Sequence, residues 1–113
     1  MNEKDILKRD YRKCNGDTIG YHYEAERKRV AAYYGDKEIG ECCFSSGGSK
    51  VWNIDHTYVE PEYRGNEIGG QLVKNVVKIA KENQIKIVPL CPFASKEFER
   101  KPEYRELEYK KDS

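Results

Sequence analysis

The sequence is short of the residues that usually build a protein core. Leu, Ile, Val and Phe together account for 22 of 113 residues. Such scarcity indicates disorder when the net charge is high, but here 21 basic residues balance 20 acidic ones and the net charge is +1. Nine tyrosines, many of them in strand-like runs, supply further apolar surface. We therefore expect one small folded domain with a charged exterior.

Long apolar runs, a signal peptide and an excess of basic residues are also missing. No apolar run approaches the roughly 18 residues that cross a bilayer, and the polar N-terminus has no apolar signal-peptide region. Residues 1–30 carry eight basic and six acidic side chains, and residues 31–113 carry thirteen and fourteen. Neither part has the basic excess of a phosphate-backbone binder. We expect a cytoplasmic protein that binds neither a membrane nor nucleic acid.

The cysteines show neither a CxxC pair nor a zinc-like spacing. Neighbouring Cys42 and Cys43 should point to opposite faces of a strand, which argues against a disulfide between them. We expect free thiols and no bound metal. The four residues are Cys14, Cys42, Cys43 and Cys91.

The first half of the periodic sequence predicts an antiparallel meander. Residues 27–34 and 39–45 read as two strands, and residues 51–59 form a third strand that is rich in β-branched and aromatic side chains. The segments between them, GDKE and SSGGS, are turns of hairpin length.

The second half predicts a β-α-β unit. Residues 67–83 have apolar side chains at helical spacing, with Asn66 as a plausible N-cap and Asn83 as the stop. Residues 85–91 read as a short apolar strand, and a short helix that is broken before Pro102 follows. The strand–helix–strand order implies a right-handed crossover between parallel strands. The fold class is therefore α+β (mixed α/β), an antiparallel meander followed by one parallel crossover.

Pro89 lies inside the last predicted strand, where it cannot donate a ladder hydrogen bond. Either this strand is an edge strand, or it separates from its neighbour at this point. Two parallel strands that splay apart leave a slot lined by unpaired backbone groups. An extended ligand that contains amides could fill such a slot.

The segment RGNEIGG, residues 64–70, lies between a predicted strand and a helix N-terminus. The first helical turn leaves about four N–H groups without partners, and these bind phosphate well. Arg64 adds a charged donor, and Gly65 lets the loop approach a ligand. Gly69 and Gly70 each cost about 1 kcal/mol relative to Ala in a helix, a cost tolerated where a side chain would block something. Alternatively, the glycines only allow close packing of the helix on the sheet.

The stretch HTYVEPEYRGNEIGGQLV, followed by IVPLCPF and PEY, resembles the GNAT superfamily of acetyl-coenzyme A-dependent N-acetyltransferases, especially its minimal single-domain branch. The resemblance runs from roughly residue 20 to residue 108. It implies a mixed sheet whose two central parallel strands splay to admit the pantetheine arm, in agreement with the slot at Pro89. The chain then divides into an N-terminal arm (1–18), a GNAT-like N-acetyltransferase domain (19–109) and a polar tail (110–113).

The resemblance implies acetyl-coenzyme A as cosubstrate and assigns its binding residues. The end of the strand before the loop contacts the pantetheine and the acetyl carbonyl through its backbone. The loop and the first helical turn receive the diphosphate, and the segment after the next strand completes the site. The assigned residues are Tyr58, Val59, Arg64, Gly65, Asn66, Glu67, Ile68, Gly69, Gly70, Cys91 and Phe93.

Glu67 departs from the family pattern, because it occupies the first glycine position of the loop. A carboxylate repels a diphosphate by about 1 kcal/mol at 4 Å in water, and by more where water is excluded. As the first helical residue, Glu67 could point outward and leave its N–H available, which we favour. Otherwise it weakens the binding of the cofactor or abolishes it.

The resemblance also points to His56 and Cys91 as catalytic residues, near the ends of the strands that should splay. His56 could take a proton from the amine, or be a structural histidine bonded to Asp55 or Thr57. Cys91 could be a nucleophile, a proton donor to the thiolate or a small apolar residue beside the ligand. We prefer direct transfer.

The side chains of the strand that carries His56 have two possible arrangements. Strict alternation would place Ile54, His56 and Tyr58 on one face of this strand. A β-bulge, common in the corresponding strand of the family, would change that arrangement.

The function implied is transfer of an acetyl group to a primary amine of a peptide, a protein or a small molecule. Acetyl-coenzyme A and this unidentified acceptor are the expected partners. The alternative is a non-catalytic module on the same fold that binds coenzyme A or a protein partner. Glu67 and the small size favour the module, whereas His56 and Cys91 beside the loop favour the enzyme.

Overall fold

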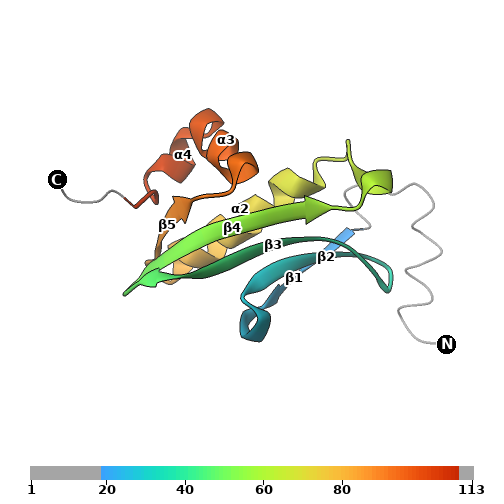
Figure 1. Cartoon of the computed structure of the whole chain (residues 1–113), viewed down its shortest axis with the longest axis horizontal. Helices are drawn as coiled ribbons and strands as arrows, with labels where there is room; N and C mark the ends of the chain where they lie inside the picture. The colour runs from blue at the N-terminus through green and yellow to red at the C-terminus, as the bar shows by residue number, and fades with distance from the viewer. Residues whose placement is uncertain (1–18, 110–113) are drawn as a thin grey trace.

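The computed structural model describes residues 19–109, and Figure 1 shows their arrangement. The predicted arm and tail at residues 1–18 and 110–113 lie outside these residues. Two short 3-10 turns, η3 (Ala25–Arg27) and η4 (Pro61–Tyr63), complete the element order. The strands and helices are β1 (Ile19–Glu24), β2 (Arg29–Tyr34), β3 (Lys37–Gly48), β4 (Val51–Val59), α2 (Ile68–Glu82), β5 (Lys86–Pro89), α3 (Pro92–Arg100) and α4 (Pro102–Arg105).

The five strands form one sheet in the order β1-β2-β3-β4-β5. The first four strands pair antiparallel, and β4 and β5 pair parallel across the α2 crossover. This mixed sheet confirms the predicted fold class. Strand β1 was not predicted, although Ile19, Tyr21 and Tyr23 of the segment IGYHYE alternate with polar residues and glycine as in a strand.

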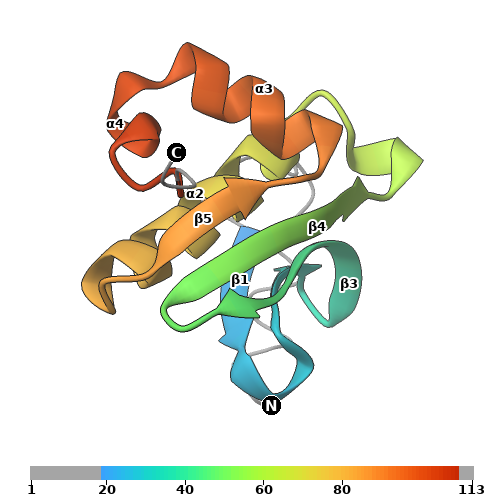
Figure 2. The same ribbon diagram turned by 60° about the vertical axis from the view of Figure 1, so that its left-hand side comes forward.

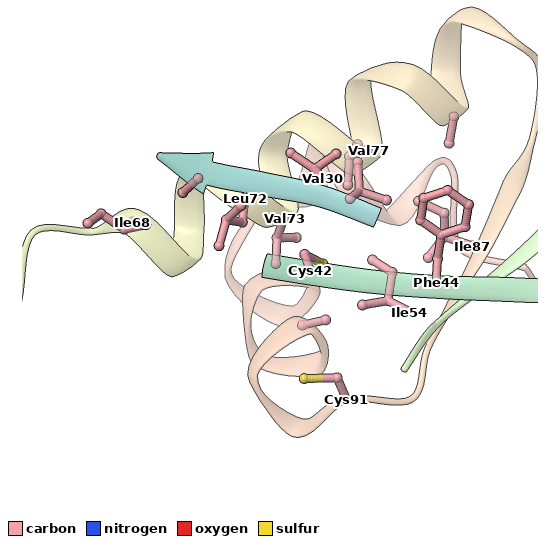
Figure 3. Packing of buried hydrophobic residues seen from close by; sticks show 14 of the residues in the cluster. Val30, Cys42, Phe44, Ile54, Ile68, Leu72, Val73, Val77, Ile87 and Cys91 are labelled. Atoms are coloured by element: carbon pink, nitrogen blue, oxygen red, sulfur yellow. The ribbon is translucent and has the colours of Figure 1, made fainter. Parts of the chain in front are cut away.

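Helix α2 covers one face of the sheet, while α3 and α4 lie beyond β5 (Figures 1 and 2). The apolar stripe of α2 is buried against side chains that come from β2, β3, β4 and β5 (Figure 3). Burial of this stripe supplies the main stabilisation that such a small domain can have. The labelled core side chains include Val30, Cys42, Phe44, Ile54, Leu72, Val73, Val77 and Ile87.

Several predicted boundaries shift by a few residues. Strand β3 continues through Gly48, so the turn before β4 is shorter than SSGGS. Helix α2 ends at Glu82 with Asn83 as its C-cap, in agreement with the predicted stop at Asn83, but Asn66 is not its N-cap. That position belongs to Glu67, and the Asn66 amide instead donates to the carbonyl of Tyr63 at 2.9 Å.

Strands β4 and β5 separate after Pro89. Their ladder runs from Val51↔Lys86 to Ile54↔Pro89, while β4 continues to Val59. The next two amides, of Leu90 and Cys91, both donate to the carbonyl of Ile54, at 3.1 and 2.9 Å. The parallel ladder therefore ends at Ile54↔Pro89, where two successive amides share one acceptor, and the predicted splay is present. The nitrogen of Pro89 is on the edge of β5 that faces away from β4, as the amide of Ile87 is.

The opposite edge of β5 is bonded to the C-terminal segment. The amide of Ile87 donates to Leu107, and the amide of Tyr109 donates to Ile87, each at 2.7 Å. No described helix is long and apolar enough to cross a membrane.

Candidate functional site

The second half of β4 presents backbone groups to the space that β5 leaves. The amide of Glu60 donates to Ile39 of β3 at 2.8 Å. By the alternation of an antiparallel ladder, the backbone groups of Thr57 and Val59 then face away from β3. The guanidinium of Arg64 occupies one of them, because its Nε donates to the carbonyl of Val59 at 2.8 Å. The remaining groups can hydrogen-bond an extended ligand that contains amides.

A β-bulge in β4 decides which side chains face this space. The register passes from Cys43↔His56 to Phe44↔Ile54, so Asp55 is an extra residue. Ile54 is fully buried, whereas His56 and Tyr58 are exposed. Of the two expected arrangements, strict alternation is therefore wrong and the β-bulge is present. The bulge places Ile54 on the opposite face of the strand from His56 and Tyr58. His56 and Tyr58 lie on the face opposite α2, which we call the outer face.

The loop that joins β4 to α2 brings backbone amides together at the helix start. The first helical bond runs from the amide of Gln71 to the carbonyl of Glu67 at 3.1 Å. The N–H groups of Ile68, Gly69 and Gly70 therefore have no acceptor within the helix. They carry the partial positive charge of the helix N-terminus and suit an anion.

Glu67 has an unusual backbone conformation for a residue with a side chain. Its φ is 61° and its ψ is 24°, in the left-handed region. Glycine adopts this conformation without steric cost, whereas other L-residues lose roughly 1 to 2 kcal/mol. The expectation that Glu67 is the first helical residue is wrong, because it precedes the helix. Its side chain is exposed and makes no capping bond.

A cavity of about 490 Å³ joins the end of β4 to the start of α2. All the predicted cofactor-binding residues line it except Asn66 and Cys91. The residues that line it but were not predicted are Thr57 and Glu97. The complete set is Thr57, Tyr58, Val59, Arg64, Gly65, Glu67, Ile68, Gly69, Gly70, Phe93 and Glu97.

Helix α3 closes the cavity and comes very near the first turn of α2. A Cβ atom at Gly69 would lie 2.9 Å from the ring of Phe93, whereas one at Gly70 would lie 3.7 Å from Glu97 Oε1. Glu97 is 4% exposed and accepts a hydrogen bond from Arg100. Gly69 is therefore needed for close packing, but against α3 rather than against the sheet.

His56 lies on the outer face and, unlike its neighbours Thr57 and Tyr58, does not line the cavity. Its Nε2 lies 3.2 Å from Glu41 Oε2, and its side chain is 51% exposed. Its ring is nearly parallel to that of Tyr58, with 6.4 Å between the centroids. The partner of His56 is thus Glu41 of β3, rather than the expected Asp55 or Thr57. The sequence alone could not indicate the Glu41–His56 pair, because this pair depends on the register between β3 and β4.

Cys91 lies on the opposite side of β4 from His56. It is 6% exposed, and its Sγ is 3.6 Å from the hydroxyl of Thr57, which also contacts Cys42 Sγ at 3.5 Å. Since Thr57 and His56 are consecutive in the strand, their side chains point to opposite faces. The structure therefore brings Cys91 to Thr57 at the cavity but does not join it to His56.

The described cysteines, Cys42, Cys43 and Cys91, are free thiols. Burial raises the pKa of Cys42 to about 12, and burial followed by the charge of Glu41 raises that of Cys43 to about 11. Both thiols are therefore protonated near neutral pH. Within residues 19–109, no group of three or more His, Cys, Asp or Glu side chains is placed to hold a metal ion.

Comparisons with known proteins agree with this architecture. The chain resembles the NMR solution structure of a GCN5-like protein from Staphylococcus aureus, with 32% identity and a TM-score of 0.59, over 73% of this chain and 83% of that one. It also resembles, in fold alone, a crystal structure of a GNAT-family protein from Desulfovibrio desulfuricans. There the identity is 16% and the TM-score 0.51, over 64% of this chain and 52% of that one.

No curated protein matches the sequence closely enough to count as a relative. A family model described as GCN5-related N-acetyl-transferase matches residues 23–107, which is most of the chain. The protein therefore belongs to the GCN5-related N-acetyltransferase family.

Proposed function

We propose that the protein transfers an acetyl group from acetyl-coenzyme A to a primary amine of a peptide, a protein or a small molecule. One observation carries this proposal: the cavity connects the unpaired edge of β4 to the amides at the start of α2. The edge suits the amides of a pantetheine arm, and the helix start suits a diphosphate. When bound, acetyl-coenzyme A would supply the activated acyl group as a thioester.

The residues present fit this cosubstrate. The backbone of Thr57, Tyr58 and Val59 would hold the pantetheine. The loop and the first turn of α2 would hold the diphosphate, with Arg64 adding positive charge at the rim. Apolar contact comes from Ile68 and from the half-exposed Phe93, and Cys91 lies behind Thr57. The proposed binding residues are therefore Thr57, Tyr58, Val59, Arg64, Gly65, Asn66, Glu67, Ile68, Gly69, Gly70, Cys91 and Phe93.

We assign His56 the role of general base. Its position on the outer face, half exposed and next to Tyr58, allows an acceptor to approach from solvent. The neutral amine forms a C–N bond with the thioester carbonyl carbon, and His56 takes the proton that the nitrogen loses. The C–S bond then breaks, and the products are an amide and a free thiol.

We assign Cys91 to the other side of the reaction, where it gives its proton to the departing thiolate and regains one from solvent. Direct transfer is favoured over an acetyl-cysteine, because a nucleophilic cysteine needs an activating base. Such a base would have to be His56, and Cys91 contacts Thr57 instead.

Two variants and the mass of the wild-type protein separate the possible roles of Cys91. A proton donor predicts that Cys91→Ser and Cys91→Ala both lose turnover, because a serine hydroxyl is too weak an acid to protonate a thiolate, and that the wild-type protein does not become acetylated. A nucleophile predicts loss in both variants and an acetylated wild-type protein by mass spectrometry. Retention of full turnover in both would leave Cys91 as a lining residue only.

The second candidate is a non-catalytic module that binds coenzyme A or a protein partner. Glu67 favours it, because a carboxylate at the loop opposes the binding of a diphosphate. Native mass spectrometry of the purified protein with added acetyl-coenzyme A tests the binding. Incubation with a library of amine and peptide acceptors tests the catalysis, through the release of free thiol and the mass of the acetylated acceptor. Binding without thiol release above background would favour the module.

A further inference from the structure

A buried arginine on the outer face gathers three carboxylates. Arg29 is 3% exposed. Its Nε donates to Glu24 at 2.7 Å, its Nη1 and Nη2 donate to Glu38 at 2.9 Å each, and Nη1 donates to Glu41 at 2.7 Å. A buried guanidinium is tolerated only when it is paired in this way, and the pairing raises its pKa further. The side chain of Arg29 is therefore held in one position on the outer face by these carboxylates.

Glu41 connects the side chain of Arg29 to His56. One carboxylate oxygen, Oε1, accepts from Arg29, and the other, Oε2, lies 3.2 Å from His56 Nε2. Burial alone would raise the pKa of the Glu41 carboxyl, but the hydrogen bond and the charge of Arg29 outweigh it and hold the pKa below its ordinary value. Glu41 is therefore an ionised acceptor at neutral pH, with both of its oxygens engaged.

We propose that Glu41 is a positioning residue for His56 and that Arg29 holds Glu41 in the orientation this requires. The inference rests on the proposed role of His56 as the base. If Nε2–H of His56 donates to Glu41, the lone pair that accepts a proton lies on Nδ1. The carboxylate also stabilises the imidazolium that forms when the amine loses its proton. The arrangement has the logic of the carboxylate–imidazole pair in a hydrolase triad.

Among residues 19–109, Glu41 is the acidic side chain within ion-pair distance of His56. Cys43 is the register partner of His56 on β3, and its raised pKa keeps it neutral at pH 7. Tyr58 presents a parallel ring from the same strand. Asp55 lies in the bulge, and Arg29 stands behind Glu41.

The kinetic test compares Glu41→Gln with Glu38→Gln. Both variants remove one negative charge from Arg29, but only Glu41 contacts His56. With acetyl-coenzyme A and an acceptor found in the library assay, we expect Glu41→Gln to lower kcat by about 10- to 100-fold, as for carboxylates behind metal-bound imidazoles. The KM for acetyl-coenzyme A should stay the same. The acid limb of the kcat–pH profile should move to lower pH in Glu41→Gln and stay in place in Glu38→Gln.

A double variant tests the coupling of the two residues. In the His56→Ala background, Glu41→Gln should cause no further loss of kcat, because its effect acts through the imidazole. Equal pH profiles for Glu41→Gln and Glu38→Gln, or full additivity of the Glu41→Gln and His56→Ala effects, would overturn the proposal.

An NMR measurement separates this inference from the proposed function. The ¹⁵N shifts of the neutral imidazole report which nitrogen carries the proton, whether or not the protein is active. A free neutral histidine already favours the Nε2–H tautomer, so we expect His56 of the wild type to hold this tautomer almost exclusively and to relax in Glu41→Ala toward the mixture of a solvent-exposed histidine. An unchanged tautomer ratio would overturn the inference. If this test succeeds but no acceptor is acetylated, the proposed function fails while the Glu41–His56 pairing stands.

Discussion

The ring of Phe93 fills the space that a side chain at Gly69 would need. A Cβ atom at residue 69 would come within 2.9 Å of the ring, a distance that real Cβ contacts do not show. With a side chain at residue 69, the ring of Phe93 would have to move away from the first turn of α2. This contact lies at the wall of the cavity, so it affects the proposed cosubstrate site directly.

The two glycines of this turn should respond differently to alanine. Gly70→Ala meets only Glu97 at an ordinary contact distance and gains helix propensity, so it should raise the free energy of unfolding by about 1 kcal/mol. Gly69→Ala must displace Phe93 and should show no such gain. Urea unfolding of both variants measures the difference, and an equal gain in the two would contradict the packing described here.

A larger change at residue 69 should affect cosubstrate binding before turnover. Gly69→Glu places a carboxylate among the amides at the start of α2, where the diphosphate is proposed to bind. We expect the Kd for acetyl-coenzyme A to rise by about tenfold or more, equivalent to about 1.4 kcal/mol. Isothermal titration calorimetry measures this. A normal Kd with impaired kcat would refute the assignment of this turn to the diphosphate.

The left-handed backbone of Glu67 predicts a stabilising substitution. Glu67→Gly should relieve steric strain and raise the free energy of unfolding by about 1 kcal/mol. Glu67→Ala removes the same charge but keeps a Cβ atom, so it serves as the matched control and should not be stabilised. Both variants should bind acetyl-coenzyme A more tightly, since each removes a carboxylate near the diphosphate. If the two variants were equally stable, strain at residue 67 would not be the cause.

The proposed role of His56 predicts a loss of rate rather than of affinity. His56→Ala should lower kcat by about 100-fold or more, the usual contribution of a general base, and leave the Kd for acetyl-coenzyme A within a few-fold. His22→Ala provides a control, because His22 packs against Tyr33 at a centroid distance of 5.3 Å and has no assigned catalytic role. Steady-state kinetics and calorimetry together decide the case. A weaker Kd with an unchanged kcat would remove His56 from the chemistry.

The hydrogen bond from Tyr33 to Glu24 should make stability depend on pH. The Tyr33 hydroxyl lies 2.5 Å from Glu24 Oε2. This bond, with Arg29, holds the pKa of the Glu24 carboxyl below its ordinary value of 4.5 despite some burial. A lowered pKa in the folded state contributes stability above pH 4.5, and this contribution is lost as the pH falls through the folded-state value.

Tyr33→Phe tests this dependence. The variant should be less stable than the wild type at pH 7, by about 1 kcal/mol, and the difference should shrink at pH 3. Tyr23→Phe, at an exposed tyrosine that is not bonded to Glu24, should show no pH-dependent difference. Chemical unfolding at the two pH values gives both comparisons. A constant deficit for Tyr33→Phe across this range would mean that Glu24 is not involved.

The sequence predicts those parts of the fold whose pattern is local. Strand β4 has its predicted bounds, because β-branched and aromatic residues fill it and turn residues flank it. Helix α2 is one residue shorter than predicted at each end, and it was predictable because its apolar stripe repeats at helical spacing. Pro89 correctly indicated an edge strand that separates from β4. Its nitrogen is on the same edge of β5 as the amide of Ile87, which faces the C-terminal segment, so the missing N–H does not itself end the ladder with β4.

Features that depend on pairing or backbone conformation were beyond the sequence. The bulge at Asp55 is defined by the register with β3, so the faces of His56 and Tyr58 could not be assigned from β4 alone. Asn66 was a reasonable N-cap by residue type, yet the left-handed conformation at Glu67 moves the helix start. The pairing of Glu41 with His56 joins two strands and needs the same register.

The bonds that Ile87 makes to Leu107 and Tyr109 have a consequence for solubility. The C-terminal segment hydrogen-bonds the edge of β5 that faces away from β4. The amides and carbonyls of this edge are therefore not available for pairing with a neighbouring molecule. Removal of residues 107–109 would expose a short ribbon that can recruit a second copy. Self-association of the protein would then depend on a segment that takes no part in the proposed chemistry.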